Sequence, residues 1–206
     1  MFPLEHTVAP TAVVPLHIFE PRYRALAAAV TSLDEPEFGI APIERGREVG
    51  GEDVRADVAV VARVVDFEEY PDGRWALIAV ATRRLRVIEW LTDDPYPRAR
   101  VEDWPDDDAD RYVAQLGDDP LTTMTAELER IGAAVARLQP DHPVDVPTLS
   151  DDPAQATWEA AGFAQLNSLD TTTLLRTPGA AERLHLAEGL VRERAEMLEA
   201  LADERG

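Results

Sequence analysis

Residues 15–26 read Pro-Leu-His-Ile-Phe-Glu-Pro-Arg-Tyr-Arg-Ala-Leu, and they carry the densest structural signal in this chain of 206 residues. The segment from Thr11 to Ile18 is mostly apolar and β-branched, which favours a strand. Pro21 suits the first position of a helix, because its missing N–H needs no partner there. Apolar residues then recur on one helical face as far as Val30. The stretch therefore predicts a strand that turns at Pro21 into a helix.

Two charged residues lie inside this predicted corner. Glu20 and Arg22 stand beside large apolar side chains, and an unpaired buried charge costs several kcal/mol. They have two interpretations: a ligand site, or a buried ion-pair network that locks the corner. We favour the structural interpretation. The residues assigned to this structural motif are Pro15, His17, Phe19, Glu20, Pro21, Arg22 and Tyr23.

The first half of the chain predicts short strands around this helix. With the strand before Pro21 there are six, at residues 11–18, 37–43, 57–69, 75–81, 83–90 and 98–102. Between the third and fourth, Tyr70-Pro71-Asp72-Gly73 has Pro where a turn begins and Gly where a positive φ is needed. Residues 57–81 therefore predict a β-hairpin.

The second half of the chain predicts four helices. They begin at Asp119-Pro120, at Asp152-Pro153, at Asp170 as the N-cap of a short helix, and at Thr177-Pro178. The proline-rich residues 139–149 predict a loop. Strands followed by helices indicate an α+β fold. We divide it into a β-rich subdomain at residues 1–115 and an α-helical subdomain at residues 116–206.

Composition excludes several classes of function. The formal net charge is −20, from 40 acidic and 20 basic residues. Such a surface repels phosphate backbones and anionic lipids, so we expect neither a nucleic-acid nor a membrane partner. There is no cysteine, and no apolar run approaches the ~20 residues of a membrane span, so we expect a cytoplasmic protein. Every basic residue is arginine, which excludes a Walker lysine and a Ser-Lys dyad within these residues.

The remaining residues supply no recognisable catalytic or metal site. None of the three serines stands in a Gly-x-Ser-x-Gly turn, and the four histidines lie far apart in sequence. We interpret His17 as a hydrogen-bonded core histidine. The acidic residues 102–110 are interpreted as a solvated boundary rather than a calcium loop. We therefore expect no catalytic residue, no cofactor and no metal.

Several segments resemble one known family in order along the chain. Phe2-Pro3-Leu4 followed by Pro15 to Tyr23 is similar to the opening signature of the Lon protease N-terminal (substrate-binding) domain family. Further similar segments are Phe38-Gly39-Ile40, Val61 to Val64, Pro71 to Arg74, Arg83 to Val87, Pro95-Tyr96, Leu174-Leu175 and Glu182 to Leu184. Two details depart from the family pattern: Ala81 or Thr82 replaces a usual glycine, and Val54 to Val58 lacks a Val-Gly pattern.

The resemblance implies a fold and a role. The fold is a PUA-like six-stranded β pseudobarrel followed by an α-helical bundle. The role is recognition of polypeptide substrates, including exposed apolar segments. In the protease an ATPase and a Ser-Lys peptidase follow this domain. We expect neither activity here, and we expect a stand-alone member of the family.

We therefore predict a non-catalytic module that binds unfolded or apolar polypeptide segments, by edge-strand addition or in an apolar pocket. The candidate aromatic anchors are Phe19, Tyr23, Trp75 and Trp90. A small-molecule-binding or regulatory adaptor domain is the alternative, and a large closed pocket lined with aromatic residues would favour it. Whether such a module acts alone or delivers substrates to an ATP-dependent protease in trans is left open by the sequence.

Overall fold

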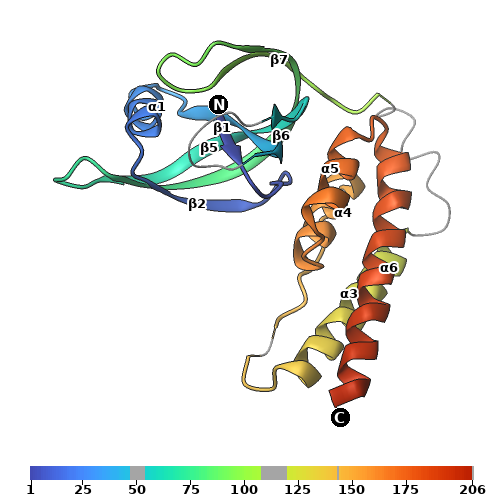
Figure 1. The fold of residues 1–206 in the computed structure, drawn as a ribbon. Helices are drawn as coiled ribbons and strands as arrows, with labels where there is room; N and C mark the ends of the chain where they lie inside the picture. The colour runs from blue at the N-terminus through green and yellow to red at the C-terminus, as the bar shows by residue number, and fades with distance from the viewer. Residues whose placement is uncertain (47–53, 108–119, 143, 206) are drawn as a thin grey trace. The chain divides into compact units, whose positions relative to one another are not determined.

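The structure is a computed structural model that describes residues 1–206 apart from 47–53, 108–119, 143 and 206 (Figure 1). The described chain divides into two compact units, Met1–Pro105 and Asp106–Gly206. The predicted subdomain boundary at residue 115 lies within 108–119, outside the described residues. None of the described helices is both long and apolar enough to cross a membrane.

A mixed sheet with one helix beside it makes up the first unit. Its strands are β1 (Phe2–Leu4), β2 (Val13–Ile18), β3 (Glu37–Arg45), β4 (Val54–Arg55), β5 (Val58–Glu69), β6 (Trp75–Leu91) and β7 (Arg98–Asp103), and its helix is α1 (Pro21–Thr31). The strand order is β1-β3-β5-β6-β2, with β4 paired to β3 and β7 paired to β6. Only the β1–β3 pair of these described strands is parallel.

Alternation of side chains along the strands builds the core of this unit. In β2 the side chains of Val14, Leu16 and Ile18 are buried, while those between them are exposed. Their direct partners on β6 include Leu77 and Trp75, which are buried on the same face. The predicted 57–81 hairpin is confirmed as β5 and the start of β6.

The sheet differs from the prediction in three respects. The strands predicted at 75–81 and 83–90 are one strand, β6, because Val61 pairs with Arg83 and Ala62 with Ala81, so that Thr82 is an extra residue in a bulge rather than a break. The short strands β1 and β4 were not predicted. The sheet has seven described strands, and their pairings do not close it into a ring, so the six-stranded pseudobarrel stays a prediction.

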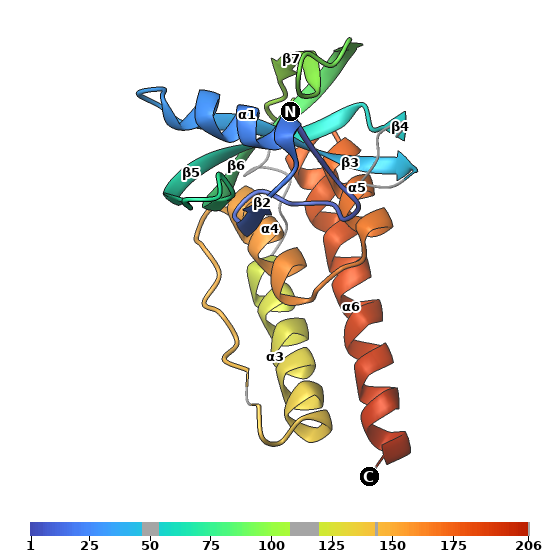
Figure 2. The same ribbon diagram turned by 60° about the vertical axis from the view of Figure 1, so that its left-hand side comes forward.

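Four described helices form the second unit. They are α3 (Pro120–Leu138), α4 (Pro153–Phe163), α5 (Ser168–Arg176) and α6 (Ala180–Arg205). The long helices α3 and α6 lie side by side in Figure 2, and α6 also contacts α4 and α5. Met124 and Leu128 of α3 and Leu184 and Val191 of α6 are buried, as their helical spacing predicts. The α+β class is therefore confirmed.

Of the three predicted helix starts that fall on described residues, one is confirmed and two are wrong. Asp152 caps α4, since its side chain accepts a hydrogen bond from the Ala154 N–H at 3.0 Å. The cap of α5 is Asn167 rather than Asp170, because the Asn167 side-chain oxygen accepts from the Asp170 N–H. Helix α6 begins at Ala180, since Thr177 still belongs to the end of α5. The predicted cap Asp119 lies outside the described residues.

Candidate binding site at the corner and the hairpin turn

The corner between β2 and α1 has the predicted geometry. Strand β2 ends at Ile18, and α1 begins with Pro21 at its first position. Glu20 occupies the N-cap position in an extended conformation, with φ −68° and ψ 137°. Phe19 falls in the short link between the two elements, where neither the sheet nor the helix covers it, and it is 59% exposed.

The charges of the corner pair with each other. The Arg22 Nε donates to the Glu20 carboxylate at 3.1 Å, and both side chains are about one-fifth exposed. The Arg22 guanidinium also lies 4.5 Å from the centre of the Tyr23 ring. Tyr23 is only 3% exposed and stacks on Phe2 at a centroid distance of 4.3 Å. Glu20 and Arg22 therefore pair with each other within the corner, and Tyr23 lies in the core. The structural interpretation of Glu20 and Arg22 stays a prediction.

The β5–β6 turn lies against this corner. Gly73 has φ +76°, as the turn motif requires. A side-chain carbon at Gly73 would collide with the guanidinium of Arg24, so α1 covers the turn closely. The Asp72 carboxylate accepts hydrogen bonds from the Arg74 N–H and Arg74 Nε, and these bonds hold the pKa of Asp72 below its usual value.

Corner and turn together enclose an apolar pocket of about 140 Å³. Its lining residues are His17, Ile18, Phe19, Tyr70, Arg74 and Trp75. Trp75 is 8% exposed and its ring lies 6.0 Å from that of Phe67, which is itself half-exposed. An apolar cavity of this size holds one benzene-sized group, so the pocket can accept one apolar side chain.

An exposed apolar surface continues from the pocket along β2. Val13, Pro15 and Ile78 are exposed, and Pro15 lies directly opposite Ile78 across the β2–β6 pair. Among the described strands β2 pairs only with β6, so its other side is an edge of the sheet. Pro15 has no N–H to offer an incoming strand, so an edge addition would lack one hydrogen bond there.

The four candidate anchors do not form one site. Phe19 and Trp75 line the same pocket, whereas Tyr23 is a core residue. Trp90 lies at the opposite end of β6 from Trp75. Its Nε1 donates to the Ala56 carbonyl at 3.1 Å, and the Arg55 guanidinium lies 5.0 Å from its ring centre. Each candidate's role in binding stays a prediction.

Arg55 also holds the surroundings of Trp90 in place. It donates two hydrogen bonds to the Asp93 carboxylate, at 2.9 and 3.0 Å. The bonds from Arg55 outweigh the effect of burial and lower the pKa of Asp93. Trp90 therefore packs beside an arginine that is itself held in an ion pair, and such surroundings are typical of a structural residue.

The interpretation of His17 as a core residue is wrong. His17 is exposed, because the alternation along β2 turns Leu16 and Ile18 inward and the residue between them outward. Sequence reasoning also missed Tyr70 and Arg74 as lining residues. Their signal was the turn motif itself: Tyr70 is its first residue and Arg74 directly follows it, and the Tyr70 N–H donates to the Arg74 carbonyl at 2.8 Å. In the part of the chain that the structure describes, no three His, Asp or Glu side chains gather as a metal site.

Comparison with known proteins links this geometry to one family. The sequence model of the "ATP-dependent protease La (LON) substrate-binding domain" matches residues 1–193. Lon protease 1 of Herpetosiphon aurantiacus is 26% identical over 204 residues, which cover 94% of this chain and 24% of that protein. Lon protease 2 of the same organism is 29% identical over 105 residues, which cover 50% of this chain and 13% of that protein. The chain thus spans at most a quarter of these curated relatives.

Solved structures share the fold. A Lon N-terminal domain protein from Xanthomonas campestris has a TM-score of 0.63 and 26% identity, covering 89% of this chain and 92% of that one. The N-terminal domain of the Mycobacterium avium complex Lon protease has a TM-score of 0.61 and 20% identity, covering 92% of this chain and 96% of that one.

Proposed function

Because the chain belongs to the family of LON substrate-binding domains, we propose that it binds unfolded polypeptide segments with exposed apolar side chains. The pocket between Phe19 and Trp75 is proposed to hold one of those side chains. The matched family is the substrate-binding, non-catalytic part of the protease, so the prediction that these residues are not an enzyme is confirmed.

One observation carries the proposal: the ring of Phe19 is exposed and at the same time lines an apolar pocket. Phe19 is largely exposed although it stands between two buried residues of the corner, Ile18 and Tyr23. Large apolar side chains that line a pocket and remain exposed are typical of binding surfaces. Burying one Leu- or Phe-sized group contributes about 1.5–3 kcal/mol, so the pocket alone supports weak binding that several contacts along a chain would strengthen.

The volume of the pocket distinguishes the proposal from its alternative. A small-molecule module needs a concave site of roughly 300–1,000 Å³ for a drug-sized ligand. The aromatic-lined pocket holds about 140 Å³, which fits a single side chain better. The missing N–H of Pro15 on the β2 edge likewise favours anchoring in the pocket over strand addition.

The proposal is tested by titrating a fluorescent, unfolded apolar polypeptide with the full chain and following its anisotropy. Phe19→Ala is expected to weaken binding about tenfold, since it removes one wall of the pocket. Ile88→Ala is the matched control, because Ile88 is also exposed on the same unit but does not line the pocket. An equal Kd for wild type and Phe19→Ala would exclude this pocket, and no binding by the folded wild type at high micromolar concentration would exclude the function.

A partner protease is a separate part of the proposal. The domain is proposed to deliver bound segments to an ATP-dependent protease in trans. Capture from the extract of the source cell, with and without Phe19→Ala, tests this: the protease should be retained by both forms, and unfolded substrates only by the wild type.

A further inference from the structure

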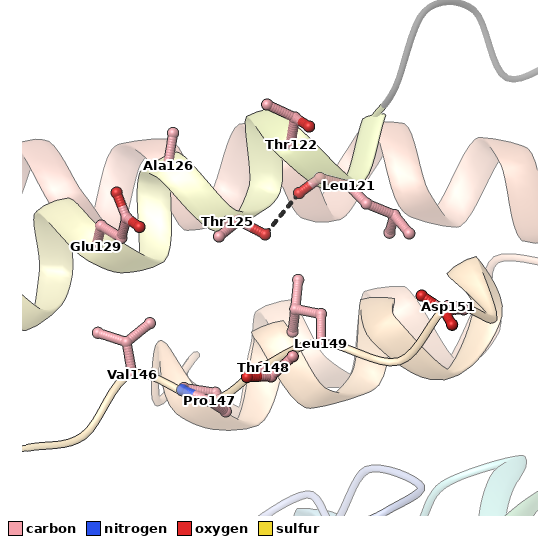
Figure 3. A pocket seen from close by; sticks show the side chains of 10 residues that line it. All are labelled: Leu121, Thr122, Thr125, Ala126, Glu129, Val146, Pro147, Thr148, Leu149 and Asp151. Carbon is pink, nitrogen blue, oxygen red and sulfur yellow. Dashed lines mark hydrogen bonds between the residues drawn. The ribbon is translucent and has the colours of Figure 1, made fainter.

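We propose that a groove in the second unit, between α3 and the segment Val144–Asp151, binds an extended polypeptide segment that carries arginine or lysine next to apolar residues. This site is separate from the Phe19–Trp75 pocket and does not depend on it. We call the segment Val144–Asp151 the strap. The groove has a volume of about 590 Å³. Figure 3 shows the side chains that line it.

The lining of the groove combines apolar and acidic side chains. From α3 it includes Leu121, Thr122, Thr125, Ala126 and Glu129, and from the strap Val146, Pro147, Thr148, Leu149 and Asp151. Among the described residues, no lysine, arginine or histidine lines it. Its apolar groups favour aliphatic side chains, and its two charges, both negative, favour a cation.

Its length suits a short stretch of extended chain. Leu121, Thr125 and Glu129 follow one another at intervals of four residues, so they lie along one face of α3 (Figure 3). Eight helical steps at 1.5 Å span about 12 Å. At roughly 3.3 Å per residue, this length matches about four residues of an extended peptide.

The acidic groups of the groove differ in their ion pairing from Glu127, another acidic residue of α3. Glu127 is paired with Arg130 at 2.6 Å and with Arg192 at 3.5 Å. Glu129 and Asp151, in contrast, have no basic partner among the described residues, and both are exposed. Because no described residue neutralises these two charges, they can attract a cationic side chain, and the net charge of −20 reinforces that attraction at long range.

The strap offers main-chain groups as well. It belongs to no helix or strand, and the described structure gives no hydrogen bond to the N–H or C=O groups of Val146, Thr148 and Leu149. An extended peptide recognises such groups by main-chain pairing, while its side chains fill the adjacent groove. The strap is held at one end by close packing of Val146 on Gly132 of α3, so this part of the groove wall is already in place.

The test uses the full chain and a labelled peptide in which two arginines flank three aliphatic residues, with fluorescence anisotropy as the readout. The matched peptide has glutamine in place of both arginines. Wild-type protein is expected to bind the arginine peptide about tenfold more tightly than the glutamine peptide, and this preference should fall as salt rises. No preference between the two peptides would overturn the proposal.

Variants locate the site. Glu129→Gln combined with Asp151→Asn should remove the tenfold preference, while the thermal midpoint stays unchanged because both side chains are exposed. Glu196→Gln is the matched control, since Glu196 is an exposed acid of the same unit that does not line the groove. Phe19→Ala should weaken the binding of both peptides alike, through their shared aliphatic residues, and leave the tenfold preference for the arginine peptide unchanged. A loss of that preference with Phe19→Ala but not with the groove variant would assign the arginine recognition to the other pocket and overturn the proposal.

Discussion

Arg183 and Asp106 form a doubly hydrogen-bonded ion pair inside the second unit. The two terminal guanidinium nitrogens of Arg183 donate to the two carboxylate oxygens of Asp106 at 2.8 and 2.7 Å. The Arg183 side chain is 1% exposed, and its guanidinium lies 4.7 Å from the centre of the Trp158 ring. The pair therefore joins the start of this unit to α6 and α4.

Removal of the Asp106 carboxylate should strongly destabilise the second unit. Asp106→Ala leaves the buried Arg183 charge without its partner, and breaking a buried pair in this way costs about 3–5 kcal/mol. The measurement is urea unfolding followed by fluorescence, because Trp158 contacts Arg183 and reports on this region. Asp203→Ala is the control: it breaks the exposed Arg137–Asp203 pair and should cost less than about 1 kcal/mol. Equal losses would contradict the structural role of Asp106.

Truncation to alanine should lower the stability of the protein strongly at Tyr23 and hardly at all at Phe19. Tyr23→Ala removes a buried ring stacked on Phe2 and should cost about 3–5 kcal/mol of unfolding free energy. Phe19→Ala removes an exposed ring and should change stability by less than about 0.5 kcal/mol. Thermal unfolding of both variants measures the difference, and a large loss for Phe19→Ala would show that this ring is part of the core.

The stabilisation that Glu37 gives to the first unit should be lost in acid. Burial would raise the pKa of Glu37, but hydrogen bonds from Arg63 and Arg83 outweigh it, so the pKa lies below its ordinary value of 4.5. A depressed pKa means that the stabilisation is present above about pH 4.5 and is lost as the pH falls through the folded-state value.

The variant Glu37→Gln tests this pH dependence. It should cost about 1 kcal/mol at neutral pH, and its difference from wild type should shrink toward zero in acid. Glu35→Gln is the control, since Glu35 is exposed and its side chain has no ion pair among the described residues. The measurement is the unfolding free energy of wild type and Glu37→Gln at several pH values. A difference between the two that stays constant with pH would disprove the role of Glu37.

Two helical glycines should respond differently to an added methyl group. A Cβ added at Gly189 of α6 would meet nothing within 4 Å beyond its chain neighbours and the adjacent backbone of its own helix, so Gly189→Ala should stabilise by about 0.5–1 kcal/mol through helix propensity. At Gly132 the new Cβ would stand 2.6 Å from a Val146 methyl carbon. Gly132→Ala should therefore gain less stability, or lose some, because the strap must shift.

The strap's movement can be measured directly. Limited proteolysis or amide exchange within Val144–Leu149 should be faster in Gly132→Ala than in Gly189→Ala. Equal protection in both variants would show that Val146 adapts without displacing the strap.

Local signals in the sequence were enough for the corner and for most elements of the fold, but not for the short strands β1 and β4. Pro21 fixes where α1 begins, Gly73 supplies the positive φ of the turn, and Asp152 caps α4. Each of these depends on one or two neighbouring peptide units, so the sequence predicts it directly. The α+β class and the family follow from the same order of segments.

Only the folded structure shows which side chains are buried, which are exposed and which of them contact one another. Tyr23 and Phe19 are both aromatic and four positions apart, yet one is buried and the other exposed, because only the packing of α1 on the sheet decides which residues of the corner face inward. The pocket joins residues 17–19 to residues 70–75, and the Arg183–Asp106 pair joins positions 77 apart. Such contacts depend on how the elements pack together, and no spacing within a single segment specifies them.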